Sequence, residues 1–75
     1  MGMTEIEKKK ATEMVKKAKE ANYSAEVIVM IGILAFSKDN IGHEIETCDK
    51  FIDLIDKYPD EREFFKYACL AVGIR

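Results

Sequence analysis

The chain has 75 residues, of which 48% are hydrophobic and 35% are charged, and its formal net charge is −2 at pH 7. A chain of this length forms one domain that buries about 60% of the surface exposed by its unfolded form. We therefore do not expect a deep active-site cleft within a single copy of the chain. The slightly acidic balance supplies no general attraction to nucleic acid or to anionic lipid. We therefore expect a single domain over residues 1–75 that binds neither of these through bulk charge.

The N-terminal segment is polar, so it does not have the pattern of a secretory leader. Within this domain, residues 1–3 are expected to be disordered or vector-derived. The longest apolar run, residues 27–36, is about half of the roughly 20 residues that span a bilayer. These features predict a cytoplasmic protein with no membrane segment. Cys48 and Cys69 each fall in an apolar stripe and are predicted to be buried free thiols.

A first helix is predicted from Thr4 to about Ala21. Thr4 and Glu7 have the spacing of a capping box, in which each side chain bonds the backbone amide of the other residue. Small and apolar residues then recur every three or four positions, at Ala11, Met14, Val15, Ala18 and Ala21. This face is narrow and alanine-rich, so the helix should lie close to a neighbour but bury little.

A second helix is predicted from the N-cap residue Ser24 to Ser37 or Lys38. Residues 27–36 are all apolar or glycine, so such a helix is apolar around its whole circumference and needs neighbours on every side. The β-branched residues in the run also suit a buried strand, but no other segment shows the alternation of a pairing partner. The helical interpretation is therefore preferred.

A third helix is predicted from about Ile41 to Tyr58, where Pro59 ends it. Its apolar stripe has alternating spacings of four and three residues, which makes it the clearest amphipathic helix of the chain. A fourth helix is predicted from Glu61 to about Val72. The expected fold is all-α: a small compact four-helix domain in which the apolar second helix (24–38) is central and the first helix is the least firmly held.

The residues that usually carry chemistry do not form a recognisable site. His43 and Glu44 begin a pattern similar to the zinc-binding His-Glu-x-x-His, but Thr47 stands where the second histidine is required. His43 is also the only base available to Ser24, Ser37, Cys48 or Cys69 as a nucleophile. The glycines are isolated and do not form a phosphate-binding loop. We therefore expect no enzyme activity, no metal and no cofactor.

Charge is distributed unevenly along the chain. Residues 1–20 contain six lysines and four glutamates, a balance of +2, whereas residues 44–63 contain eight acidic and three basic residues, a balance of −5. The lysine-rich helix offers a way to bind nucleic acid, although interleaved glutamates make ordinary intrahelical pairing the better interpretation. The acidic helix suits a basic protein partner, or it serves only to keep an apolar bundle in solution.

These patterns lead to one hypothesis and one alternative. The hypothesis is a small prokaryotic or phage protein that binds or regulates other proteins without catalysis and acts as a homodimer. The alternative is a nucleic-acid accessory protein that uses the first-helix lysines. The predicted self-interface comprises Val27, Met30, Ile31, Gly32, Leu34 and Ala35. The predicted partner surface comprises Glu46, Asp49, Asp53 and Asp56. Gly32 interrupts a helix at a cost of about 1 kcal/mol relative to alanine, which a close helix crossing would justify.

Overall fold

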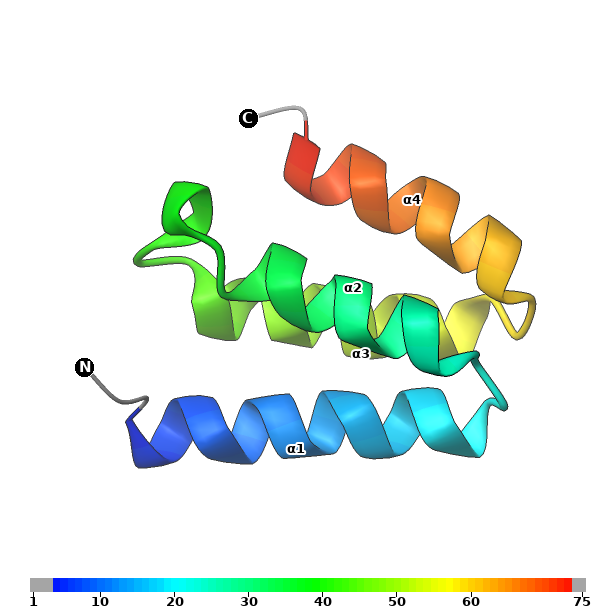
Figure 1. The fold of residues 1–75 in the computed structure, drawn as a ribbon, viewed down its shortest axis with the longest axis horizontal. Coiled ribbons are helices and arrows are strands. Elements are labelled where there is room, and N and C mark those ends of the chain that lie inside the picture. The colour runs from blue at the N-terminus through cyan, green and yellow to red at the C-terminus, as the bar shows by residue number, and fades with distance from the viewer. Residues whose placement is uncertain (1–3, 74–75) are drawn as a thin grey trace.

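The computed structural model describes residues 4–73, with side chains up to residue 71, and throughout this range it contains helices and no strand. The prediction of a small all-α domain is confirmed for this part of the chain. Residues 1–3, predicted to be disordered or vector-derived, lie outside the described residues. The elements are α1 (Glu5–Glu20), α2 (Ala25–Ala35), the short 3₁₀ helix η1 (Lys38–Asn40), α3 (Glu44–Lys57) and α4 (Glu61–Gly73). Their arrangement is shown in Figure 1.

The first two helices begin where the sequence predicts. The Thr4 amide donates to Glu7 Oε1 at 2.9 Å, and the Glu7 amide donates to Thr4 Oγ1 at 3.2 Å, which completes the capping box. Ser24 Oγ accepts from the Val27 amide at 3.4 Å. Each cap satisfies an amide that has no partner within its own helix, and this fixes the start of the helix.

The connection between α2 and α3 departs from the prediction. The second helix ends at Ala35 rather than at Ser37 or Lys38, and η1 follows it. Gly42 has φ 89°, a backbone conformation that residues with a Cβ rarely adopt, so the chain turns there and α3 begins at Glu44 rather than at Ile41. The predicted bounds were wrong because the sequence pattern continues through a turn that a glycine allows.

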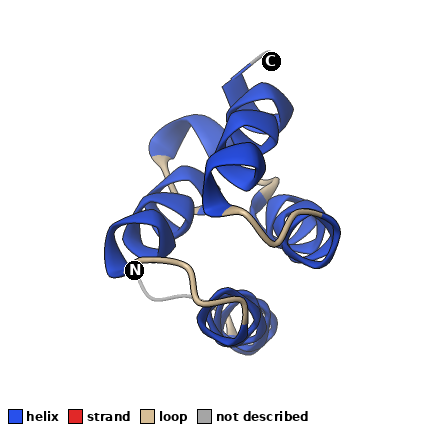
Figure 2. Cartoon of the chain, turned by 90° about the vertical axis from the view of Figure 1, so that its right-hand side faces the viewer, coloured by secondary structure: helices blue, strands red, loops and turns tan. Residues whose placement is uncertain are grey.

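The central helix is α3, not α2. Its most extensive contacts are with α1 and then with α4, and it also touches α2. In the end-on view of Figure 2, α1, α2 and α3 form a triangle, and α4 lies across the side formed by α2 and α3. The prediction that α2 is central is not confirmed, nor is the prediction that α1 is the least firmly held. The alanine-rich face of α1 allows the close packing on α3 that its narrowness suggested.

Two long-range ion pairs show that α1 and α3 run in the same direction. Lys10 Nζ lies 2.7 Å from Asp49 Oδ1, and Lys17 Nζ lies 3.1 Å from Asp56 Oδ1. Both pairs join residues 39 positions apart, and they are two helical turns apart along each helix. A constant offset over two turns requires parallel helices, so α2 returns the chain between them.

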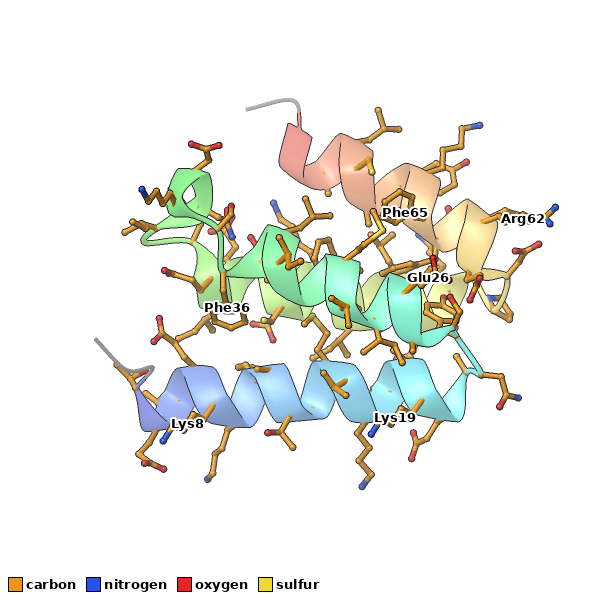
Figure 3. All side chains as sticks on the ribbon, viewed as in Figure 1. Lys8, Lys19, Glu26, Phe36, Arg62 and Phe65 are labelled. Atoms are coloured by element: carbon orange, nitrogen blue, oxygen red, sulfur yellow. The ribbon has the colours of Figure 1, made fainter. Side chains whose placement is uncertain are left out.

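The core lies where all four helices meet. Phe64 of α4 is fully buried between Tyr23, with ring centroids 5.0 Å apart, and Phe51 of α3, with centroids 6.0 Å apart. Phe36 and Phe65 pack against this core on either side of α2, Phe36 toward α1 and Phe65 from α4 (Figure 3). The aromatic part of the core therefore comes from α3, from α4 and from the residues that flank α2, whereas α1 contributes Met14 and Ala18 and α2 contributes Ile31 and Ala35.

Two buried polar residues hold the connection between α2 and α3. Asn40 is 1% exposed, and its Nδ2 donates to the Ala35 carbonyl at 2.7 Å and to Thr47 Oγ1 at 2.9 Å. The first bond satisfies a carbonyl at the C-terminus of α2, where the helix itself offers no partner. Asn40 thereby ties the end of α2 to the first turn of α3.

Candidate interaction surfaces

The outer face of α2 exposes three large apolar side chains. Val29 is 59% exposed, Met30 43% and Ile33 63%, and they recur at the spacing of one helix face. In Figure 1 this helix lies in front of α3. Contiguous exposed apolar side chains mark interaction surfaces more often than isolated ones do.

The predicted self-interface is only partly available. Ile31 and Ala35 are fully buried inside the protomer, so their assignment to a self-interface is wrong. Val27 and Leu34 are partly buried and pack against the core. Met30 is exposed as expected. The error has a simple cause: on a helix that is apolar around its circumference, the sequence pattern does not distinguish the face turned to the core from the face turned to solvent.

Gly32 has open space where a side chain would begin. A Cβ built on this residue meets nothing within 4 Å other than its own helix and chain neighbours. Within the protomer, therefore, no close helix crossing accounts for this glycine. The residue remains available for close approach from outside.

The predicted acidic partner surface is divided among internal contacts. Asp49 and Asp56 are paired with Lys10 and Lys17 across the seam between α1 and α3. Hydrogen bonding and charge attraction from these two aspartates raise the pKa values of the two lysines. Glu46 Oε1 lies 3.4 Å from Lys50 Nζ, one turn along the same helix. Of the four residues of the predicted partner surface, only Asp53 has no ion pair within the described part of the chain.

A groove that the sequence pattern did not predict lies between α3 and α4. It has a volume of about 440 Å³, and its apolar part is formed by Leu54, Tyr67, Leu70 and Ala71. Leu70 is 48% exposed and Tyr67 37%. Lys50, Asp53 and Lys57 of α3 complete the lining on one side. The groove is invisible to a search of single helices because its apolar residues come from the flanks of two helices whose stripes were assigned to the core.

An aromatic pair, formed by the residue that follows α3 and one residue of α4, lies beside this groove. The rings of Tyr58 and Tyr67 stack with centroids 4.6 Å apart and planes 15° apart. Lys66 Nζ lies 5.9 Å from the Tyr67 ring centroid. The stacking places Tyr67 against Tyr58 at the edge of the groove.

The lysines of α1 fall into two groups. Lys10 and Lys17 face α3, as described above, whereas Lys8, Lys9, Lys16 and Lys19 are exposed. Lys8 and Lys19 lie on the outer side of α1 in Figure 3. Glu5 and Glu13 line the same outer surface as Lys8, Lys9 and Lys16. The surface therefore alternates in sign instead of forming a basic stripe.

The remaining candidates for chemistry are dispersed. Cys48 is buried, as predicted, and burial raises the pKa of its thiol to about 11; Cys69 is exposed, so its predicted burial was wrong. His43 is exposed and precedes α3 without a side-chain cap bond. Among the described residues, no three or more His, Cys, Asp or Glu side chains gather in a way that could hold a metal ion. Within residues 4–73, none of the helices combines the length and the apolar character that a bilayer span requires.

Comparison with known proteins gave no relative: no family model, no curated protein and no solved structure matches this chain.

Proposed function

We propose that this protein is a non-catalytic protein-binding or regulatory module that acts as a homodimer. The observation that carries the proposal is the outer face of α2, where Val29, Met30 and Ile33 are exposed on the side opposite to the core. A domain of this size gains nothing in stability from three large apolar side chains in water, so a binding partner is the physical reason to keep them there.

The groove between α3 and α4 is a second apolar surface, and none of its lining residues belongs to α2. A module with two such surfaces can cover one of them with a second copy of itself and present the other to a different protein. A cytoplasmic location belongs to the same proposal, as does a prokaryotic or phage source, which rests on small size and a Lys-, Glu- and Ile-rich composition.

The homodimer is tested by the solution mass of the reduced protein, measured by light scattering behind a sizing column over a wide concentration range. The expected result is twice the protomer mass of 8.6 kDa at the upper concentrations. A mass of 8.6 kDa at every concentration would remove self-association from the proposal.

Binding of a different protein through α2 is tested with the variant Ile33→Lys and a matched control, Thr12→Lys, which adds the same charge at an exposed position of α1. A protein crosslinked by the wild type and by Thr12→Lys but not by Ile33→Lys would support the proposal. Identical crosslinking by all three chains would exclude the outer face of α2 as the binding surface.

The alternative is a nucleic-acid accessory protein that uses the exposed lysines of α1. Glu5 and Glu13 on the same surface weaken the attraction to phosphate. Binding to DNA or RNA that falls steeply as salt is raised, and that is lost on replacing Lys8, Lys9 and Lys16 together, would favour this alternative.

A further inference from the structure

We infer that the second copy of the chain docks on the surface formed by α3 and α4, with the two α3 helices antiparallel, and that the outer face of α2 stays free. This inference rests on the proposed homodimer and specifies its interface. It comes from a charge pattern on α3 that becomes complementary over its whole length when a second copy is turned end for end.

A row of four exposed charged residues follows the solvent side of α3. Glu46, Lys50, Asp53 and Lys57 are separated by four, three and four positions, so they lie on one face of the helix. Along the chain their charges are negative, positive, negative and positive. We call these residues the α3 charge row.

The α3 charge row is complementary to itself in one orientation. Because the spacing of four, three and four is the same from both ends, an antiparallel copy places Glu46 opposite Lys57 and Lys50 opposite Asp53. The symmetry of a two-fold axis repeats both pairs, which gives four pairs of opposite charge. A parallel copy in the same register would place each residue opposite itself, with like charges facing. The row therefore favours the antiparallel pairing and fixes its register.

The same symmetry brings the two grooves together. The two-fold axis lies perpendicular to α3 and within the interface, at the level between Phe51 and Ile52, so α4 of one copy lies over α4 of the other. The apolar lining of each groove, to which Leu54, Tyr67 and Leu70 contribute, then becomes part of the same interface. The α3 charge row forms one rim. An apolar centre beside a charged rim is the usual composition of a specific interface.

Size and charge both favour this surface over the outer face of α2. A standard interface buries about 800 Å² on each partner. The surface formed by α3 and α4 is two helices wide and about 20 Å long, at about 1.5 Å per residue, whereas α2 offers one helix of about 16 Å. The only charged residue of α2 is Glu26, near its N-terminal end in Figure 3, so that helix supplies no pattern that would fix a register.

The first experiment compares two matched variants, Leu70→Lys and Ile33→Lys. Each puts one lysine in place of an exposed aliphatic side chain, 48% and 63% exposed respectively, so both protomers should fold, which circular dichroism would verify. In a two-fold dimer each change acts twice, and Leu70→Lys should raise the dimer dissociation constant by roughly 100-fold. Ile33→Lys should leave it unchanged.

The second experiment inverts the whole α3 charge row, with Glu46→Lys, Lys50→Glu, Asp53→Lys and Lys57→Glu in one chain. All pairs of opposite charge are kept both within the helix and between two inverted copies, so this variant should dimerise as the wild type does. A mixed dimer would face like charges at all four positions. Native mass spectrometry of isotope-labelled wild type mixed with the inverted chain should therefore show mixed dimers depleted roughly tenfold or more below the statistical proportion.

The outcomes separate this inference from the function on which it rests. If the wild type dimerises and Ile33→Lys rather than Leu70→Lys abolishes the dimer, the homodimer stands and the α3–α4 interface is wrong. Mixed dimers in statistical proportion would likewise overturn the antiparallel register. A wild type that remains monomeric at every concentration would overturn both the inference and the proposed homodimer.

Discussion

The seam between α1 and α3 and the outer face of α2 show opposite relations between hydrophobicity and burial. The α1 helix is rich in lysine and alanine, yet Met14 and Ala18 are fully buried, and two lysines reach across to aspartates of α3. The α2 helix is the most apolar of the chain, yet three of its large side chains are exposed. Close packing depends on a face that fits its neighbour, and a small-residue face achieves this better than a uniformly apolar one.

The contrast between burial and exposure on α2 is tested most directly by truncating two isoleucines of this helix. Ile31 is fully buried and Ile33 is 63% exposed. We expect Ile31→Ala to lower the free energy of unfolding by about 2–5 kcal/mol, because it leaves a cavity. Ile33→Ala should change it by no more than about 0.5 kcal/mol. Urea denaturation at a concentration where the wild type is monomeric gives both values, and equal losses would mean that α2 is buried on both sides.

Enlarging a small residue tests the α1–α3 seam directly. Ala18 is fully buried in the face of α1 that packs along α3, so Ala18→Leu should lower stability by about 1–3 kcal/mol through overpacking. Ala25 is exposed, which makes Ala25→Leu the matched control. The melting temperature of Ala18→Leu should be clearly lower than that of Ala25→Leu. If Ala18→Leu is as stable as the wild type, the packing between α1 and α3 is loose enough to accept the larger side chain.

Gly32→Ala should stabilise the protomer. The space at its Cβ position is open, so the change gains helix propensity, about 1 kcal/mol, without a clash. Gly42→Ala is the contrasting change, because φ is 89° there and the new side chain would be strained. A Gly32→Ala protein that is more stable as a monomer but no longer dimerises would indicate that a second copy approaches α2 closely, against the interface inferred above.

The smallest effect concerns the two thiols. Burial raises the pKa of Cys48 to about 11 from its ordinary value of 9.0, whereas Cys69 is exposed. Because the pKa of Cys48 is raised in the folded state, the contribution of this thiol to the free energy of unfolding is complete below about pH 9. That contribution is lost as the pH rises toward 11. At pH 8 we expect iodoacetamide to alkylate Cys69 alone, as measured by intact mass. The control is Cys69→Ser, which should stay unlabelled when folded and gain one label in denaturant.

Signals that act within a few residues predicted the four helices. The capping box at Thr4, the cap at Ser24 and the break at Pro59 depend on neighbours in sequence, and the structure places helix ends at each of them. The predicted start of the third helix was wrong because Gly42 introduces a turn before Glu44. Which helix is central could not be deduced, because that depends on how well two faces fit, and a hydrophobicity pattern does not contain that information.

The candidate surfaces could be predicted less well than the helices. The exposed face of α2 was recognised as surplus apolar surface, but its orientation was not, so Ile31 and Ala35 were assigned to the wrong side. The α3 charge row was present in the sequence. It was overlooked because acidic residues were grouped by sign alone, and the order of Glu46, Lys50, Asp53 and Lys57 matters more than their sum.

The parallel seam between α1 and α3 also constrains how the chain acquires its structure. Its two ion pairs each join residues 39 positions apart, so no local hairpin can form the seam, and the intervening α2 must turn back first. During synthesis α1 can meet α2 as soon as both have emerged, but α3, with which α1 makes its most extensive contacts, leaves the ribosome later. Folding should therefore be delayed and then cooperative, with α1 docking as a late event despite being made first.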